Sequence, residues 1–359
     1  MAPNDTSEPS SNSPQETESK RAASRKRFRQ KARKAEDNPE LARDLLKGDR
    51  KALSKAITLI ESVKAEDHDI ARQILESCLP HTGSAVRVGI TGIPGVGKST
   101  FIDRLGEHLI DQGHSLAVLT VDPSSSRSGG SILGDKTRMG NLAHRKQAFI
   151  RPSPTGGSLG GVARKTRETM LLCEAAGFDY VFIETVGVGQ SETAVRSMVD
   201  CFLLLALPGS GDELQGIKRG IVELADLVVL NKAEDPESKQ IREAVTALRS
   251  ALQMLPESPS GWSPEVLTCS ALKGIRIDSV WKSVETFIEH IRSNGYFDQQ
   301  RREQAKQWMY ETINHALQDD FYQDPAIKKL LKSVEQEVIE GKKSSFQAAH
   351  ELLQTYRGG

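Results

Sequence analysis

The chain has 359 residues, enough for one large domain with additions or for two domains with buried cores. Its 48 Lys and Arg residues balance 48 Asp and Glu residues, so the overall charge favours neither nucleic acid nor an anionic membrane surface as a partner. The four scattered cysteines without a CxxC pair, and the absence of a membrane-spanning or secretory apolar run, predict a cytoplasmic protein without a zinc site, disulfide framework or membrane partner.

Residues 1–38 are rich in Ser, Pro, Asn and charged side chains and have almost no apolar anchors, which predicts a disordered tail. Within this tail, residues 20–34 (KRAASRKRFRQKARK) are strongly basic and contain no acid. A basic stretch of this kind is found in transit peptides and in nucleic-acid arms. Acidic residues precede it, beginning with Asp5 and Glu8, and transit peptides are poor in acids. We therefore predict a solvated polar and basic tail.

The apolar pattern then changes twice along the chain. Residues 39–82 carry apolar side chains at helical spacing, which predicts two or three short helices. Residues 83–294 contain short apolar runs separated by helical segments, and such runs indicate an α/β core with a mostly parallel sheet covered by helices. Residues 295–359 are predicted to form polar helices that pack on their own core or on a second subunit. The predicted strands are VRVGIT, LAVLTV, YVFIET, CFLLLAL, LVVLNK and EVLTCS.

The first predicted strand runs into TGIPGVGKST, which an amphipathic helix follows. Gly92, Gly97, Lys98 and Ser99 match GxxxxGK[ST] between a strand and a helix, the context in which this pattern holds phosphates rather than forming a plain glycine-rich turn. Glycines let several backbone N–H groups face one anion, Lys98 reaches the β- and γ-phosphates, and Ser99 binds Mg²⁺. The predicted phosphate-binding residues are Gly92, Ile93, Pro94, Gly95, Val96, Gly97, Lys98, Ser99 and Thr100.

Three carboxylates stand where a triphosphate with Mg²⁺ needs hard oxygen ligands. Asp122 follows LAVLTV, Asp135 lies in GGSILGDKTRM, and Glu184 ends YVFIE. Because open α/β sheets bind ligands at the carboxyl ends of their strands, we predict all three, with Ser99, as metal ligands and Glu184 as a catalytic residue as well. The alternative for Asp122 and Asp135 is ordinary turn chemistry, because Asp-Pro and Gly-Asp are common turn dipeptides.

A switch segment is predicted after Glu184. Gly187, three residues on, is placed to give its N–H to the γ-phosphate and so to sense whether the third phosphate is present. The stretch DPSSSRSGGS is either a plain linker or a loop that orders on nucleotide binding. Ras-like GTPases orient the attacking water with a Gln directly after the glycine. Here Val188 and Gly189 intervene before Gln190, so we predict slow intrinsic hydrolysis.

Two late strands run into NKAED and SALKG, the positions at which GTPases read guanine. We predict that Asn231 fixes the loop geometry and that Lys232 lies over the purine. The backbone N–H groups of three residues are predicted to meet the guanine O6, namely Ser270, Ala271 and Leu272.

The acidic position of this pattern departs from the usual NKxD. Glu234 occupies it and Asp235 follows, so the acceptor for the two guanine N–H groups is one methylene longer or displaced by one residue. Asp235 with Pro236 also predicts a cap for the next helix. We predict Glu234 as the residue that selects guanine.

With these segments in place, the chain resembles the methylmalonyl-CoA mutase-associated GTPases, the MeaB, MMAA and ArgK-like family. The resemblance covers about residues 40–294, and the helical extensions at both ends also look like this family's. The segments that carry it are GITGIPGVGKST, VDPSSSRSGGSILGDKTRM, FIETVGVGQSE, PGSGDELQGIKRGI, NKAED and SALKG.

The resemblance implies a P-loop GTPase that acts as a G-protein chaperone. Such a protein gates delivery of adenosylcobalamin to a B12-dependent acyl-CoA mutase and protects that enzyme, while the cobalamin stays with the partner. It implies GTP, GDP and Mg²⁺ as ligands and a homodimer formed through the C-terminal arms. It also implies that PGSGDELQGIK is an extra switch, in which Gln215 and Lys218 rearrange when the partner stimulates hydrolysis. The same stretch fits a helix start after a glycine-rich turn.

Three alternatives stay open from the residues. A small-molecule kinase uses the same phosphate loop but needs a substrate pocket, and the guanine-type segments speak against it. A nickel metallochaperone GTPase shares the core, but normally brings His-rich or paired Cys ligands, whereas the eight His of this chain are dispersed. A nucleotide-binding scaffold would show no turnover. Methylmalonyl-CoA and isobutyryl-CoA type mutases leave the same motifs here.

Overall fold

The computed structural model describes residues 39–62, 64–121, 139–152, 159–185, 191–208 and 219–358. The chain divides into two compact units, which we describe separately. The first comprises Met1–Ala85 and Glu168–Val181, and the second comprises Val86–Arg167 and Phe182–Gly359.

The described part of the first unit is largely helical. Residues 39–46 form a helix, and α2 (Arg50–Glu61), α3 (Ala65–Cys78) and the short 3₁₀ helix η1 (Leu79–His81) follow. The Asp49 carboxylate caps α2 by accepting the Ala52 N–H at 2.7 Å. This cap starts a helix whose apolar stripe is buried, so the helical spacing of the sequence is observed here. The buried residues of α2 are Ala52, Leu53, Ala56, Ile57 and Ile60.

The second unit is built on a seven-stranded sheet with the order β3-β2-β4-β1-β5-β6-β7. The pairs β2–β3, β1–β5, β5–β6 and β6–β7 are parallel. Strands β1, β2, β5 and β6 are buried along their whole length, as expected for a sheet covered on both faces. The predicted α/β architecture is therefore confirmed. The strands are β1 (Val86–Gly92), β2 (Leu116–Val121), β3 (Ala148–Arg151), β4 (Tyr180–Thr185), β5 (Cys201–Ala206), β6 (Leu227–Leu230) and β7 (Glu265–Thr268).

Strand β3 was not among the predicted strands. It lies at the edge of the sheet, where it pairs with β2 from Ala148 opposite Leu116 to Arg151 opposite Leu119. Its four residues alternate between buried and partly exposed positions. An edge strand this short leaves neither a continuous apolar run nor a measurable alternation in the sequence.

Helices cover the sheet, and two of them contact each other while packing on different strands. Helix α4 (Lys98–Asp111) packs on β1 and β2, and α13 (Ile277–Ser293) packs on β5 and β6. The remaining helices of the sheet region are α7 (Gly140–Ala143), α8 (Leu159–Ala175), α9 (Ser191–Arg196), α11 (Arg219–Val222) and α12 (Lys239–Leu252).

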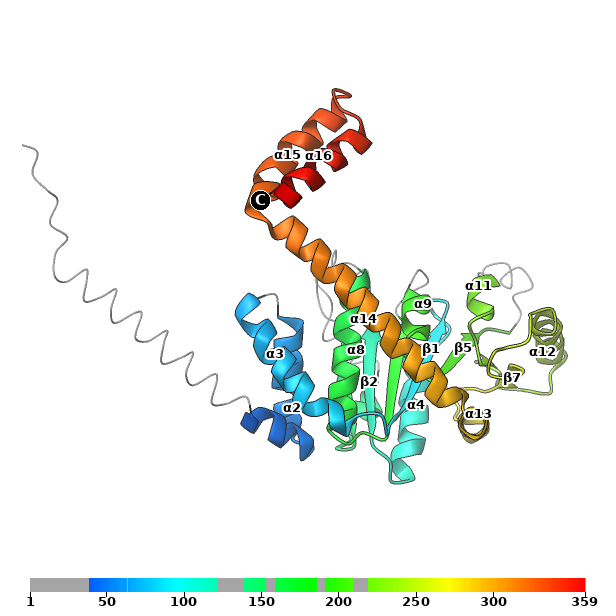
Figure 1. The fold of residues 1–359 in the computed structure, drawn as a ribbon. Coiled ribbons are helices and arrows are strands. Elements are labelled where there is room, and N and C mark those ends of the chain that lie inside the picture. The colour runs from blue at the N-terminus through cyan, green and yellow to red at the C-terminus, as the bar shows by residue number, and fades with distance from the viewer. Residues whose placement is uncertain are drawn as a thin grey trace, which may run out of the picture. The chain divides into compact units, whose positions relative to one another are not determined.

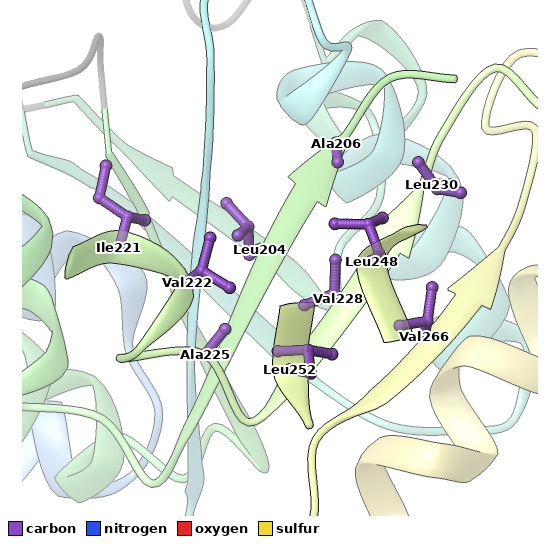
Figure 2. Packing of buried hydrophobic residues seen from close by; sticks show 10 residues of the cluster. All are labelled: Leu204, Ala206, Ile221, Val222, Ala225, Val228, Leu230, Leu248, Leu252 and Val266. Carbon is purple, nitrogen blue, oxygen red and sulfur yellow. The ribbon is translucent and has the colours of Figure 1, made fainter. Parts of the chain in front are cut away.

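The second half of the sheet is held by the apolar cluster drawn in Figure 2. Leu248 and Leu252 of α12 pack against Val228, Leu230 and Val266 of β6 and β7. Burying each such side chain contributes about 1.5–3 kcal/mol. The cluster therefore fixes the strands from whose carboxyl ends the NKAED and SALKG loops depart.

The chain ends in three helices, α14 (Tyr296–Gln323), α15 (Pro325–Ile339) and α16 (Ser345–Gly358). Helices α15 and α16 pack side by side (Figure 1) around Ile327, Val334, Ala348 and Leu352. The Asp324 carboxylate caps α15 by accepting the N–H groups of Ala326 and Ile327. Across the described residues, no helix is both long enough and apolar enough to cross a membrane.

Candidate functional site

The loop between β1 and α4 requires glycine at two positions. Gly92 has a φ of +151°, and a Cβ there would lie 2.5 Å from the Leu205 carbonyl oxygen. Gly97 has a φ of +96°, and a Cβ there would lie 2.8 Å from Asn231 Nδ2. Both positions combine a left-handed backbone with a close neighbour, so a side chain at either would displace the loop. The two glycines of the sequence pattern are therefore set by this geometry.

Lys98 begins α4 with its ammonium turned back into the loop. The side chain is buried, and Nζ donates hydrogen bonds to the carbonyl oxygens of Gly92 at 2.7 Å and of Ile93 at 3.4 Å. Burial lowers the pKa of Lys98, and the negative charges of Glu184 and Glu192 act in the opposite direction. The loop thus encloses a cation that is costly to bury, and an anion bound beside it would offset this cost.

Ser99 and Glu184 meet at the carboxyl ends of neighbouring strands. The Ser99 hydroxyl donates to Glu184 Oε1 at 3.1 Å, and Glu184 is buried. The next residue, Thr185, donates its hydroxyl to Thr91 Oγ1 at 2.8 Å and so joins β4 to β1. A hydroxyl and a carboxylate supply the hard oxygen atoms that Mg²⁺ prefers, so the two residues fit a magnesium ion. The structure brings these two predicted ligands together.

Asn231 connects the phosphate loop to the loop that follows β7. It is 2% exposed, its Nδ2 donates to the Val96 carbonyl oxygen at 2.8 Å, and its Oδ1 accepts the Ala271 N–H at 3.0 Å. Its neighbour Lys232 has a φ of +61°, in the left-handed region that side chains rarely adopt. One buried amide therefore joins the phosphate loop to the loop after β7.

Two of the three N–H groups predicted to meet the base have acceptors within the protein. Ser270 donates to the Ile275 carbonyl oxygen at 3.1 Å and Ala271 donates to Asn231. Within the described residues the Leu272 N–H has no acceptor, and the Leu272 side chain is 68% exposed. Of these three residues, Leu272 is therefore the one whose backbone N–H is open to a ligand.

Of the two acidic residues in NKAED, which the structure describes in full, Asp235 makes a hydrogen bond within the loop and Glu234 does not. Asp235 accepts the Glu237 N–H at 3.2 Å and closes a local turn. It lies three residues before Ser238, the N-cap residue of α12, so the expectation that Asp235 caps this helix is wrong. The cap residue itself makes no side-chain cap hydrogen bond. Glu234 is exposed and takes no part in this turn.

Five predicted site residues lie outside the described residues. They include two of the expected metal ligands and the switch glycine, so the structure does not describe how they meet the phosphate loop. They are Asp122, Asp135, Gly187, Gln215 and Lys218. Among the residues that the structure describes, no group of three or more His, Cys, Asp or Glu side chains could hold a metal ion.

Two residues near the site were not predicted from the sequence. Glu192, in α9, is 1% exposed, and its charge acts on Lys98. Cys269, between β7 and Ser270, places its thiol 3.6 Å from Asn231 Oδ1. Burial raises the pKa of Cys269 to about 12, so the thiol stays protonated. Glu192 ends the segment FIETVGVGQSE and Cys269 directly precedes SALKG, but their contacts with Lys98 and Asn231 are made by the fold and have no sequence signal.

Known proteins are similar to this chain over most of its length. A family model described as methylmalonyl Co-A mutase-associated GTPase MeaB matches residues 53–326. A relative from Caulobacter vibrioides is 52% identical over 320 residues, which are 89% of this chain and 98% of that protein. GTPase ArgK of Escherichia coli K12 is 43% identical over 321 residues, which are 88% of this chain and 96% of that protein.

A solved structure is similar over nearly the same span. It is described as LAO/AO transport system kinase and matches with a TM-score of 0.69 and 35% sequence identity. The match covers 89% of this chain and 98% of that one. The similarity therefore covers most of this chain and nearly all of that one.

Proposed function

The chain belongs to the methylmalonyl-CoA mutase-associated GTPase family, and on that premise we propose that it is the chaperone of an adenosylcobalamin-dependent acyl-CoA mutase. It is a GTPase, and its proposed role is to gate cofactor delivery to the mutase and to protect that enzyme. The observation that carries the catalytic part is the meeting of Ser99 with Glu184 beside the buried Lys98. The cobalamin belongs to the partner.

At the phosphate end, Lys98 exchanges its carbonyl partners for phosphate oxygens when GTP binds. Its charge then stabilises the negative charge that develops on the transferred phosphoryl group. Ser99 and Glu184 would hold Mg²⁺, which when bound neutralises charge on the β- and γ-phosphates. Water attacks the γ-phosphorus, the bond to the bridging oxygen of GDP breaks, and phosphate leaves.

At the base end, the Leu272 N–H is available to the guanine O6, and Glu234 accepts the two N–H groups on the adjacent edge. Adenine has an acceptor nitrogen and a hydrogen atom at those two positions, so it cannot satisfy the carboxylate. Asn231 keeps this end at a set distance from the phosphate loop, because it contacts both Val96 and Ala271. ATP therefore makes fewer hydrogen bonds with this loop than GTP does, and this difference is the proposed source of selectivity for GTP.

The proposed switch residues surround the γ-phosphate. Asp122, Asp135 and Gly187 are proposed to lose contacts when phosphate leaves, which changes the surface offered to the mutase. Gln215 and Lys218 are proposed to rearrange when the mutase stimulates hydrolysis. Intrinsic turnover is proposed to be slow because no Gln directly follows Gly187 to orient the attacking water.

We also propose a cytosolic homodimer formed through the C-terminal helices. Apolar side chains of α14 that face solvent in the single chain support this arrangement. At about 100° per residue, these positions fall within about 100° of one another on the helix, so they lie along one side of it. They are Met309, Tyr310, Ile313 and Leu317, which are 50%, 55%, 46% and 59% exposed.

The name of the solved relative, a transport system kinase, favours one second candidate, phosphoryl transfer to a small molecule. Transfer would give a phosphorylated organic product, whereas hydrolysis gives free phosphate. The guanine-type loops of this chain favour hydrolysis, since small-molecule kinases have no need to read guanine.

The test is phosphate release from GTP and from ATP, with and without an adenosylcobalamin-dependent acyl-CoA mutase, with mass detection of phosphorylated products. We expect GTP-selective release that the mutase accelerates. Lys98→Ala should lower turnover about 100- to 1,000-fold, the usual effect of removing one transition-state donor. Lys239→Ala, which removes an exposed lysine paired with Glu243 on α12, is the matched control and should change nothing. If no such mutase changed the rate of phosphate release, the proposed chaperone role would be wrong, and the GTPase activity alone would stand.

A further inference from the structure

Three acidic residues crowd the loop after β6, and two of them already have partners. Asp235 Oδ1 accepts the Glu237 N–H at 3.2 Å. Glu237 Oε1 accepts a hydrogen bond from Arg276 Nη2 at 3.1 Å. In the part of the chain that the structure describes, Glu234 has no hydrogen bond or ion pair, and its side chain is exposed. The loop therefore leaves one carboxylate available to a ligand.

Arg276 connects this loop to the one that follows β7. While Nη2 contacts Glu237, Nη1 donates to Thr268 Oγ1 at 2.9 Å, at the last residue of β7. Closer to the strands, the Ala233 N–H donates to the Cys269 carbonyl oxygen at 2.9 Å. The two loops are thus joined by backbone at their inner end and by the Arg276 guanidinium at their outer end.

The backbone of Arg276 is held in an unfavourable conformation. Among the described residues, two that are not glycine have a positive φ, Lys232 at +61° and Arg276 at +57°. Both lie in these two loops. A residue with a Cβ rarely occupies this region unless surrounding contacts hold it, and such residues gather at functional sites. At Arg276 the preceding turn is closed by a pair of backbone hydrogen bonds between Ser270 and Ile275, at 3.0 and 3.1 Å.

We infer that Arg276 is a positioning residue for guanine selection. By engaging Glu237 and Thr268, its guanidinium holds the NKAED loop against the SALKG loop, so that Glu234 alone faces the edge of the base. The ligand class is a guanine nucleotide, recognised by its N1–H and its 2-amino group. This inference rests on the proposed role of Glu234 as the guanine acceptor.

The experiment measures calorimetric Kd values of the full chain for GDP, IDP and ADP. IDP lacks the 2-amino group, so the ratio of GDP to IDP affinity reports how well the acidic acceptor is aligned. The variants are Arg276→Gly, Arg276→Lys and Glu237→Ala. Glycine tolerates the +57° φ, so Arg276→Gly removes the side chain without adding backbone strain, and its Tm should stay near that of the wild type. Lys239→Gln, which alters an exposed pair on α12, is the control.

We expect Arg276→Gly and Glu237→Ala each to weaken GDP binding about two- to fivefold, the range of an exposed Arg–carboxylate pair. The affinity for IDP should fall less than the affinity for GDP, so the ratio of GDP affinity to IDP affinity should decrease in both variants. Lys at position 276 should restore the ratio in part, because it keeps the charge but not the planar fork. An unchanged ratio in both variants, or equal losses for all three nucleotides, would overturn the inference while leaving base recognition intact. A wild type that binds ADP as tightly as GDP would overturn the proposed function itself.

Discussion

Gly97 and Gly113 have almost the same backbone conformation, with φ values of +96° and +95°, but different surroundings. A Cβ on Gly97 would lie 2.8 Å from Asn231 Nδ2, whereas a Cβ on Gly113 would meet nothing within 4 Å. The pair separates the general cost of a left-handed backbone from the specific cost of displacing Asn231. At the residue scale, a glycine matters to the site when another residue lies too close for a Cβ, as Asn231 does at Gly97.

We predict that Gly113→Ala lowers the free energy of unfolding by about 1 kcal/mol, the strain of an alanine at positive φ, and that Gly97→Ala costs about 1–3 kcal/mol more because it displaces the buried Asn231 amide. Only Gly97→Ala should also weaken GDP binding, by about tenfold, because Asn231 loses a buried hydrogen bond. Urea unfolding and calorimetry measure the two effects. Equal GDP affinities in the two variants would show that Asn231 does not link the loops.

Lys98 supplies a pH-dependent term to the stability of the ligand-free chain. Because burial lowers its pKa in the folded state, the unfolded chain binds the proton more tightly up to the ordinary value of 10.5. At low pH the folded state carries the full cost of burying the charged Lys98 ammonium. As the pH rises from the lowered pKa toward 10.5, Lys98 loses its proton in the folded state first, and the free energy of unfolding increases. The free energy of unfolding of the wild type should rise relative to that of Lys98→Met over this range. Denaturant titrations from neutral to alkaline pH check this, and parallel curves would contradict it.

At the scale of elements, α14 is fastened to the turn between α9 and β5. Arg301 donates from Nε and Nη2 to the two oxygens of Asp200, at 2.8 and 2.6 Å. Asp200 is 1% exposed and also accepts the Arg87 N–H at 2.8 Å. Further along the helix, Trp308 Nε1 donates to the Ser197 carbonyl oxygen at 3.1 Å. These contacts hold α14 against the end of α9 and the start of β5.

We predict that Arg301→Met lowers the free energy of unfolding by about 3–5 kcal/mol, because it leaves the buried Asp200 carboxylate without its counter-ion. Adding Asp200→Asn should recover most of this loss, since the amide oxygen can still accept the Arg87 N–H. Lys306→Met, which breaks an exposed pair with Glu303 on the same helix, should cost less than about 1 kcal/mol. Chemical denaturation of the four proteins gives the comparison. If Arg301→Met were as stable as Lys306→Met, the buried ion pair would not have the predicted role.

At the scale of the whole molecule, the proposed homodimer accounts for α14. The helix has 28 residues, of which Phe297 and Gln304 are buried. Four exposed apolar side chains gather between Met309 and Leu317, and a group of this kind is expected at a subunit interface.

Replacing Ile313 and Leu317 together by Glu should shift the protein from dimer to monomer, because two charges would be buried in an apolar interface. Met254→Glu changes an 81% exposed residue beyond α12 and should leave the mass unchanged. Light scattering coupled to size-exclusion chromatography distinguishes the two masses. A wild type that is monomeric at high micromolar concentration would refute the dimer.

Much of this protein was determined by patterns that are local in the sequence. The glycines, Lys98 and Ser99 sit in a short segment whose conformation depends on its own residues, so the phosphate loop could be located without a structure. The apolar runs of the central strands are equally local, because a strand buried on both faces must be apolar throughout. The edge strand β3 shows the limit of such patterns, since its short, half-exposed sequence has no clear period.

Which side chains meet was decided by the tertiary structure. Ser99 and Glu184 are 85 residues apart in the chain, and the order of β4 beside β1 brings them within 3.1 Å. Of the two acids that the sequence offers for the base, Asp235 accepts the Glu237 N–H, a contact that the sequence alone does not reveal. The Arg276 contacts with Thr268 and Glu237 have no sequence signature at all. Local patterns encode backbone conformation and burial, whereas contacts between distant residues depend on how the strands and helices pack, and that information is spread over the whole chain.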